Sequence, residues 1–250
     1  MNIRAVLFDI YGTLLEVGPP PPDADARWQR LFRDLLHGEP PLGRLDFAVA
    51  CSPVIARHHA AARARGIPWP EVHWPSIVTE ILPELTRLSR GDQDEFLYHQ
   101  IQTGHTVRLT AETADTLRWL RERQCLLGII SNAQAYTLRE LREALATRGL
   151  DLSLFERDLC FWSFEQGFSK PDPHVLQILT TRLHARGISH DQTLMVGDRP
   201  DNDIEPARAF GWQTWYFTTD DPASDQGGSW HRLRLHLRDL ETARPDCQGR

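Results

Sequence analysis

Four short segments of the chain place carboxylate, hydroxyl or lysine side chains at or shortly after the ends of apolar runs. In chain order they are Asp9-Ile10-Tyr11-Gly12-Thr13-Leu14, Ser131-Asn132, Ser169-Lys170-Pro171-Asp172-Pro173 and Gly197-Asp198-Arg199-Pro200-Asp201-Asn202-Asp203. A carboxylate such as Asp9 can act as a covalent nucleophile, and further carboxylates beside it can bind a hard divalent cation. A lysine such as Lys170 can supply fixed positive charge to an anionic substrate. These groups can act together only if the fold brings the four segments to one place.

The apolar runs resemble buried parallel strands, because they lack the polar alternation of a half-exposed sheet. The runs are Arg4 to Phe8, Cys125 to Ile130, Leu159 to Ser163, Leu194 to Val196 and Thr214 to Phe217. Helical patterns follow at Glu112 to Arg123, Ala135 to Arg148, Pro173 to Arg186, Ile204 to Phe210 and Trp230 to Leu240. This alternation predicts an α/β fold with a doubly wound, Rossmann-like parallel sheet. Ligands bind beyond the carboxyl ends of such strands, where the four polar segments would meet.

A long helical segment interrupts this alternation after the first strand. The chain passes through the run Pro19 to Pro22, and roughly eighty residues of helical periodicity follow. The helices predicted there are Ala24 to His37, Leu45 to Arg65, Trp74 to Leu88 and Asp92 to Gln102. We therefore predict a catalytic core of residues 1–16 and 108–240, an inserted all-helical cap domain of residues 17–107, and a tail of residues 241–250. The cap could close over a site in the core.

Together the four polar segments resemble the four sequence motifs of the haloacid dehalogenase superfamily, in the same order and across the whole core. The inserted helices are similar to the helical cap of that superfamily's first cap class. The pattern D-x-x-G-T alone occurs by chance, whereas four motifs on successive strand ends are specific. The resemblance implies a hydrolase that acts on small molecules.

The resemblance also implies how the predicted site handles a phosphoryl group. Asp9 would be the nucleophile, and the aspartyl-phosphate it forms would divide one difficult hydrolysis into two easier displacements. Negative charge spreads over the phosphoryl oxygens during transfer, so Lys170 would supply positive charge and Ser131 hydrogen-bond donors. Gly12 permits a tight turn that Thr13 can support by local bonding. The candidate phosphate-binding residues are Gly12, Ser131, Asn132 and Lys170.

A magnesium site is the second implication of the resemblance. The nucleophile and the phosphate are both anions, and a hard divalent cation held by oxygen ligands would bring them together. Asp9, Asp198 and the backbone carbonyl of Tyr11 would bind Mg²⁺. Asp203 would lie behind them and orient a metal-bound water or Lys170, although Asp201 could exchange roles with Asp203.

Tyr11 departs from the superfamily's phosphatases, which usually carry a second aspartate there to protonate the leaving oxygen. The pattern D-x-Y-G-T resembles the dehalogenase branch, where halide leaves without protonation. Those dehalogenases use no metal, and their fourth motif resembles Ser-Ser-Asn at the positions where this chain has Asp198 and Asp203. The carboxylates of this chain would repel an anionic haloacid unless a cation neutralised them. We therefore predict a magnesium-dependent phosphatase of small phosphorylated molecules. The alternatives are a metal-independent 2-haloacid dehalogenase that forms an ester on Asp9, and a non-catalytic binding protein of the same fold.

In a phosphatase the missing acid must be replaced. A stable leaving group, a cap residue or the Tyr11 hydroxyl could do so, although a phenol with a pKa of ~10 is a poor acid at neutral pH. We expect aryl or acyl phosphates to be hydrolysed far better than alkyl phosphates.

Composition indicates the class of protein and its partners. The net charge of -6 comes from 28 basic and 34 acidic residues, without a basic stripe that would follow a nucleic-acid backbone. No apolar run approaches the ~20 residues of a membrane span, and the first run is too short for a secretory signal. The four scattered cysteines fit reduced thiols. We expect a cytoplasmic protein with neither nucleic-acid nor membrane partners.

Overall fold

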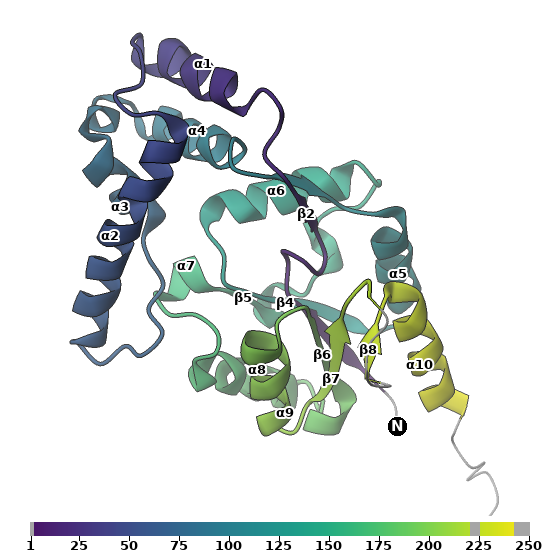
Figure 1. The fold of residues 1–250 in the computed structure, drawn as a ribbon. Helices are drawn as coiled ribbons and strands as arrows, with labels where there is room; N and C mark the ends of the chain where they lie inside the picture. Colours follow the sequence, from purple (N-terminus) through teal and green to yellow (C-terminus); the bar gives the residue numbers. More distant parts are fainter. Residues whose placement is uncertain (1–2, 221–225, 243–250) are drawn as a thin grey trace, which may run out of the picture.

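The structure is a computed structural model that describes residues 3–220 and 226–242, with a parallel sheet at its centre (Figure 1). Within these ranges the sheet has six strands in the order β5, β4, β1, β6, β7, β8. They are β1 (Ala5–Phe8), β4 (Leu126–Ser131), β5 (Cys160–Trp162), β6 (Thr193–Gly197), β7 (Gln213–Phe217) and β8 (Gly227–Gly228). β1 pairs in parallel with β4 on one side and with β6 on the other. The predicted doubly wound parallel sheet is confirmed.

Helices cover both faces of the sheet, and the side chains of β1 alternate between them. Val6 and Phe8 join a buried cluster with α5 (Ala111–Glu122), α6 (Ala135–Ala146) and α10 (Trp230–Thr242). Ala5 and Leu7 belong to the cluster on the opposite face, with α8 (Pro173–Ala185) and α9 (Glu205–Ala209). Because both faces are buried, the strand needs apolar residues at every position.

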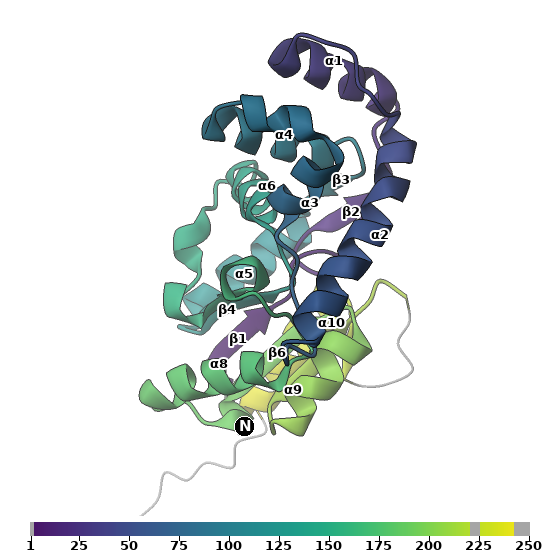
Figure 2. The same cartoon turned by 90° about the vertical axis from the view of Figure 1, so that its left-hand side faces the viewer.

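A helical insert stands on the sheet at the end where β1 finishes (Figure 2). It is joined to the core by a two-stranded antiparallel ribbon of β2 (Glu16–Gly18) and β3 (Thr106–Arg108). Between these strands lie α1 (Ala24–Leu36), α2 (Arg44–Arg63), α3 (Trp74–Ile81) and α4 (Arg90–Ile101). The ring of Trp28 lies 5.0 Å from that of Phe32 and 5.1 Å from that of Phe47. The insert therefore has a buried core of its own, separate from those that flank the sheet.

Several elements differ from the sequence-based expectations, including the short strands β2, β3 and β8, which were not predicted. The single helix predicted from Trp74 to Leu88 is wrong, because α3 ends at Ile81 and a 3₁₀ turn follows at Pro83–Arg87. Pro83 has no N–H to donate, and it disfavours helical backbone at Leu82 before it, which has φ -122° and ψ 75°. The third strand, predicted to end at Ser163, ends at Trp162, and a short helix, α7 (Ser163–Gln166), follows it directly.

Two further expectations concern the ends of the chain and the membrane. Most of the predicted tail, from residue 243 onward, lies outside the described residues. Within the described ranges, no helix is both long enough and apolar enough to cross a membrane.

Candidate active site

The carboxyl ends of the three central strands bring the predicted site residues together. Asp9 follows β1, Ser131 ends β4 and Asp198 follows β6. The parallel register places Phe8 opposite Ile129 on one side and Val196 on the other, so the chain leaves all three strands at the same edge. This is the edge that faces the insert (Figure 2), as expected for the ligand site of an open parallel sheet.

Lys170 lies buried at the centre of this edge and is the only lysine in the sequence. Its Nζ donates hydrogen bonds to Asp9 Oδ1 at 2.7 Å, to Asp203 Oδ1 at 2.6 Å and to the Ile130 carbonyl at 2.7 Å. Burial alone would lower the pKa of Lys170, but the carboxylates of Asp9 and Asp203 raise it above its ordinary value. The three ammonium protons therefore have three acceptors, and the lysine is held both charged and in place.

Asp203 supports Lys170 and has no free carboxylate oxygen. Its Oδ1 accepts from Lys170, and its Oδ2 accepts from the Arg199 backbone N–H at 3.0 Å. Burial raises the pKa of Asp203, although the charge of Lys170 acts to lower it. A Cβ on Gly197 would overlap the Asp203 side chain, so the glycine permits this close approach. Asp201, the other candidate for this role, is exposed and pairs with the Arg199 guanidinium at 2.8 Å.

Three carboxylates form a cluster around one positive charge. Oxygen atoms of Asp9, Asp198 and Asp203 lie within 4.8 Å of one another. Burial, followed by the charge of Asp203, raises the pKa of Asp198 above its ordinary value. Lys170 compensates only one of three negative charges, and hard oxygen donors are those that Mg²⁺ prefers. The residues present therefore fit a divalent cation.

The loop after Asp9 is shaped to admit Asp198. Gly12 has φ +78°, and a Cβ there would overlap the carboxylate of Asp198. The Thr13 hydroxyl donates to Asp198 Oδ1 at 3.2 Å. Gly12 and Thr13 thus set the position of a candidate metal ligand, beyond the local turn that the sequence predicts.

Ser131 and Asn132 lie at the carboxyl end of β4 and have different surroundings. Ser131 is 1% exposed and ends β4. The Asn132 side chain binds the backbone of Lys170, accepting from its N–H at 2.7 Å and donating to its carbonyl at 2.9 Å. Asn132 therefore anchors the segment that carries the lysine, so its amide contributes to the site by positioning Lys170.

Comparison with known protein families matches residues 3–211 to the haloacid dehalogenase-like hydrolases. The chain belongs to this family. The match begins before β1 and ends after α9, so it includes all four polar segments and the insert between the first two.

Individual relatives of this hydrolase are distant. An uncharacterized hydrolase of Schizosaccharomyces pombe is 23% identical over 219 residues, covering 86% of the chain and 90% of the relative. YfnB of Bacillus subtilis, a hydrolase of the same family solved with magnesium, is 22% identical with a TM-score of 0.54 over 95% of the chain and 99% of its own. A 2-haloacid dehalogenase of Pseudomonas syringae is 19% identical with a TM-score of 0.58, over 95% and 99%. At these identities the structural matches show the fold alone, which phosphatases and dehalogenases share.

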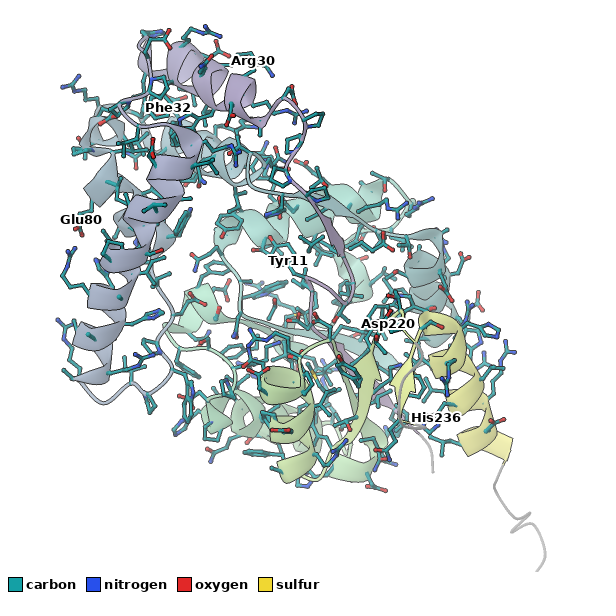
Figure 3. The ribbon with its side chains drawn as sticks, in the orientation of Figure 1. Tyr11, Arg30, Phe32, Glu80, Asp220 and His236 are labelled. Carbon is teal, nitrogen blue, oxygen red and sulfur yellow. The ribbon has the colours of Figure 1, made fainter. Side chains whose placement is uncertain are left out.

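Tyr11 is where this hydrolase departs from the phosphatase pattern, and its hydroxyl is turned toward α6 (Figure 3). The hydroxyl donates to Glu140 Oε2 at 2.5 Å and lies 3.1 Å from Thr137 Oγ1. Burial, followed by the negative charge of Glu140, raises the pKa of the Tyr11 hydroxyl far above its ordinary value. The phenol is therefore held protonated and directed at a carboxylate.

Glu140 and His105 were absent from the sequence-based site. Glu140 has a side chain only 1% exposed, and His105 Nε2 lies 3.2 Å from its Oε1. One signal was available in the sequence, since Glu140 lies on the buried face of α6 with Thr137 and Leu141. An acidic residue on such a face is almost never fully buried without a partner.

Proposed function

We propose that this hydrolase is a magnesium-dependent phosphatase that hydrolyses phosphorylated small molecules through an aspartyl-phosphate on Asp9, with residues 17–107 as a cap over the site. One observation carries the proposal, namely the cluster of Asp9, Asp198 and Asp203 around Lys170. Displacement of halide requires a nucleophile and a positive charge, but it does not require the two further carboxylates of Asp198 and Asp203. A dianionic phosphate needs more positive charge than one lysine supplies, and the carboxylates offer ligands for a cation that would supply it.

Each residue has a distinct part in the proposed reaction. A carboxylate oxygen of Asp9 attacks phosphorus, the bond to the leaving oxygen breaks, and water then attacks the aspartyl-phosphate to release phosphate and restore Asp9. Lys170 orients Asp9 and places positive charge beside the transferred group. Ser131 is the candidate donor to a phosphoryl oxygen. Mg²⁺, held by Asp9, Asp198 and the Tyr11 carbonyl, would offset the charge of nucleophile and phosphate when bound.

Removal of divalent cations tests the proposal. With a panel of phosphate esters, we expect EDTA to reduce turnover to the background rate and excess Mg²⁺ to restore it. Added Mg²⁺ should also raise the melting temperature of the metal-free protein, since a ligand that binds only the folded state stabilises it by about 2.7 kcal/mol at 100 times its Kd. Phosphatase turnover that survives EDTA would contradict the metal-dependent reaction.

Leaving-group preference is a second expected result. Because the Tyr11 hydroxyl donates its hydrogen bond to Glu140, it is not available to protonate the leaving oxygen. General acid catalysis contributes about 10²- to 10⁴-fold, so we expect kcat/KM for p-nitrophenyl phosphate to exceed that for glycerol phosphate by about 10²-fold or more. At saturating Mg²⁺, Tyr11→Phe should leave this ratio unchanged. Equal turnover of both classes, or a ratio that changes with Tyr11→Phe, would contradict this interpretation.

Haloacid dehalogenation is the second candidate function, and Tyr11 is the observation that favours it. In that reaction an Asp9 oxygen displaces halide from carbon, and water then hydrolyses the ester. The discriminating measurement is halide release from 2-chloropropionate in the presence of EDTA. Release under those conditions, without phosphate release from any ester, would assign the chain to this second function.

A further inference from the structure

Glu140 is a buried carboxylate that joins the nucleophile loop to the insert. Its Oε2 accepts from the Tyr11 hydroxyl at 2.5 Å, and its Oε1 lies 3.2 Å from His105 Nε2. The Tyr11 and His105 rings also meet edge to face, with centroids 5.6 Å apart. Tyr11 comes two residues after Asp9, and His105 directly precedes β3 of the ribbon. The Glu140 side chain of α6 therefore contacts both segments that connect the core to the insert, the one before β2 and the one before β3.

The environment of Glu140 distinguishes it from Glu143, the other acidic residue of α6. Glu143, one turn further on, is 54% exposed; it accepts from Tyr98 of the insert and pairs with Arg139 of its own helix. An exposed contact of that kind contributes little to stability. Glu140 is 1% exposed, and a carboxylate is buried only where hydrogen bonds or charges compensate for its lost hydration. Its position therefore depends on Tyr11 and His105, and the position of Tyr11 depends on Glu140.

Fixing the side chain of Tyr11 also restricts its backbone. The loop is short and internally bonded, with the Leu15 N–H donating to the Ile10 carbonyl at 2.8 Å and the Gly12 N–H to the Leu15 carbonyl at 2.9 Å. In so tight a turn, holding the phenol restricts rotation of the adjoining peptide, which carries the carbonyl assigned to Mg²⁺. Groups that orient a metal ligand typically change metal affinity by 10- to 100-fold when removed.

We propose that Glu140 is a positioning residue of the metal site, acting through the Tyr11 side chain on the Tyr11 carbonyl. This inference rests on the proposed function, because it requires that Asp9, Asp198 and Tyr11 bind Mg²⁺. It assigns Tyr11 a role that differs from proton donation. The hydroxyl keeps the loop in the shape that binds metal.

A double-mutant cycle on Mg²⁺ affinity, measured by calorimetry without substrate, tests this role. Tyr11→Phe and Glu140→Ala should each raise the Kd for Mg²⁺ about tenfold. The double variant should raise it about tenfold as well, instead of a hundredfold, because both changes remove the same contact. Glu140→Gln should retain most of the affinity, since its amide oxygen can still accept from Tyr11. Glu143→Ala, which removes an insert contact on the same helix, should leave the Kd unchanged.

The outcomes separate this inference from the proposed function. Wild-type protein that binds no Mg²⁺ would overturn both, because no metal site would then exist. Wild-type binding with a Kd unchanged in Tyr11→Phe would overturn the role of Glu140 alone, as would additive effects in the double variant. If Glu140→Ala does not fold, Tyr11→Phe compared with Glu140→Gln decides, since only the former should weaken binding about tenfold.

Discussion

Asp9→Asn is expected to lower kcat by a factor on the order of 10⁴ or more while the protein remains folded, by analogy with the loss of a nucleophile in other hydrolases. The amide matches the carboxylate in shape and still offers Lys170 an oxygen acceptor, so the hydrogen bond seen at 2.7 Å can persist. An amide oxygen is a far weaker nucleophile than a carboxylate, and the covalent intermediate cannot form. The measurement is kcat for p-nitrophenyl phosphate at saturating Mg²⁺, with circular dichroism to verify the fold.

Asp201→Asn is the matched control for this variant. Asp201 lies in the same polar segment as Asp198, but its side chain is 66% exposed and contacts Arg199. Removing its charge should leave kcat within about twofold, because exposed ion pairs contribute little.

Beryllium fluoride, a mimic of the bound phosphoryl group, should be retained by wild type and lost in Asp9→Asn. An Asp9→Asn enzyme with a tenth of wild-type kcat would exclude Asp9 as the nucleophile. A wild type that neither turns over a phosphate nor retains beryllium fluoride would support the non-catalytic alternative.

The sheet and the meeting point of the site could be predicted because both depend on local patterns. The runs before Asp9, Ser131 and Asp198 are continuously apolar, which is typical of strands buried on both faces. Once three such strands are parallel and adjacent, the residues that follow them must lie at one edge. The proximity of Lys170 is less local, since α7 and a turn separate it from the end of β5. For this residue the family resemblance supplied the information.

The support of the site could not be predicted, because its contacts join distant positions. Tyr11 and Glu140 are 129 positions apart, and His105 and Glu140 are 35 apart. Helical periodicity places Glu140 on a buried face of α6, but neither periodicity nor spacing identifies which distant residues it contacts. The ends of the insert's helices show the opposite case. Pro83 was visible in the sequence and marks the end of α3 by ordinary proline stereochemistry.

Lys170→Met is expected to affect both turnover and stability. The methionine fills a similar volume but provides no charge, so Asp9 and Asp203 would lie buried beside it without a cation. Breaking a buried ion pair by removing one partner typically costs about 3–5 kcal/mol, and we expect a loss of this size in the free energy of unfolding at neutral pH without metal. Turnover should fall by a factor on the order of 10³, the cost of one preorganised group that stabilises transition-state charge. Chemical denaturation and steady-state kinetics measure the two effects.

The pH dependence of this loss identifies its electrostatic cause. Burial already raises the pKa of Asp203, and Lys170 acts to lower it, so the pKa should rise further in Lys170→Met. A carboxyl with a raised folded-state pKa gains stability as pH falls through that pKa, because the folded state takes up a proton. The stability deficit of the variant should therefore shrink as pH decreases from 8 toward 5, whereas a packing defect would give a constant deficit.

Because the chain has one lysine, ¹³C-lysine labelling of wild type should give a single side-chain NMR signal that stays in its charged form above the ordinary lysine pKa. Lys170→Arg keeps the charge, but its planar fork does not match three acceptors around one nitrogen, so its turnover should also be low. Full turnover in Lys170→Arg would show that charge alone suffices.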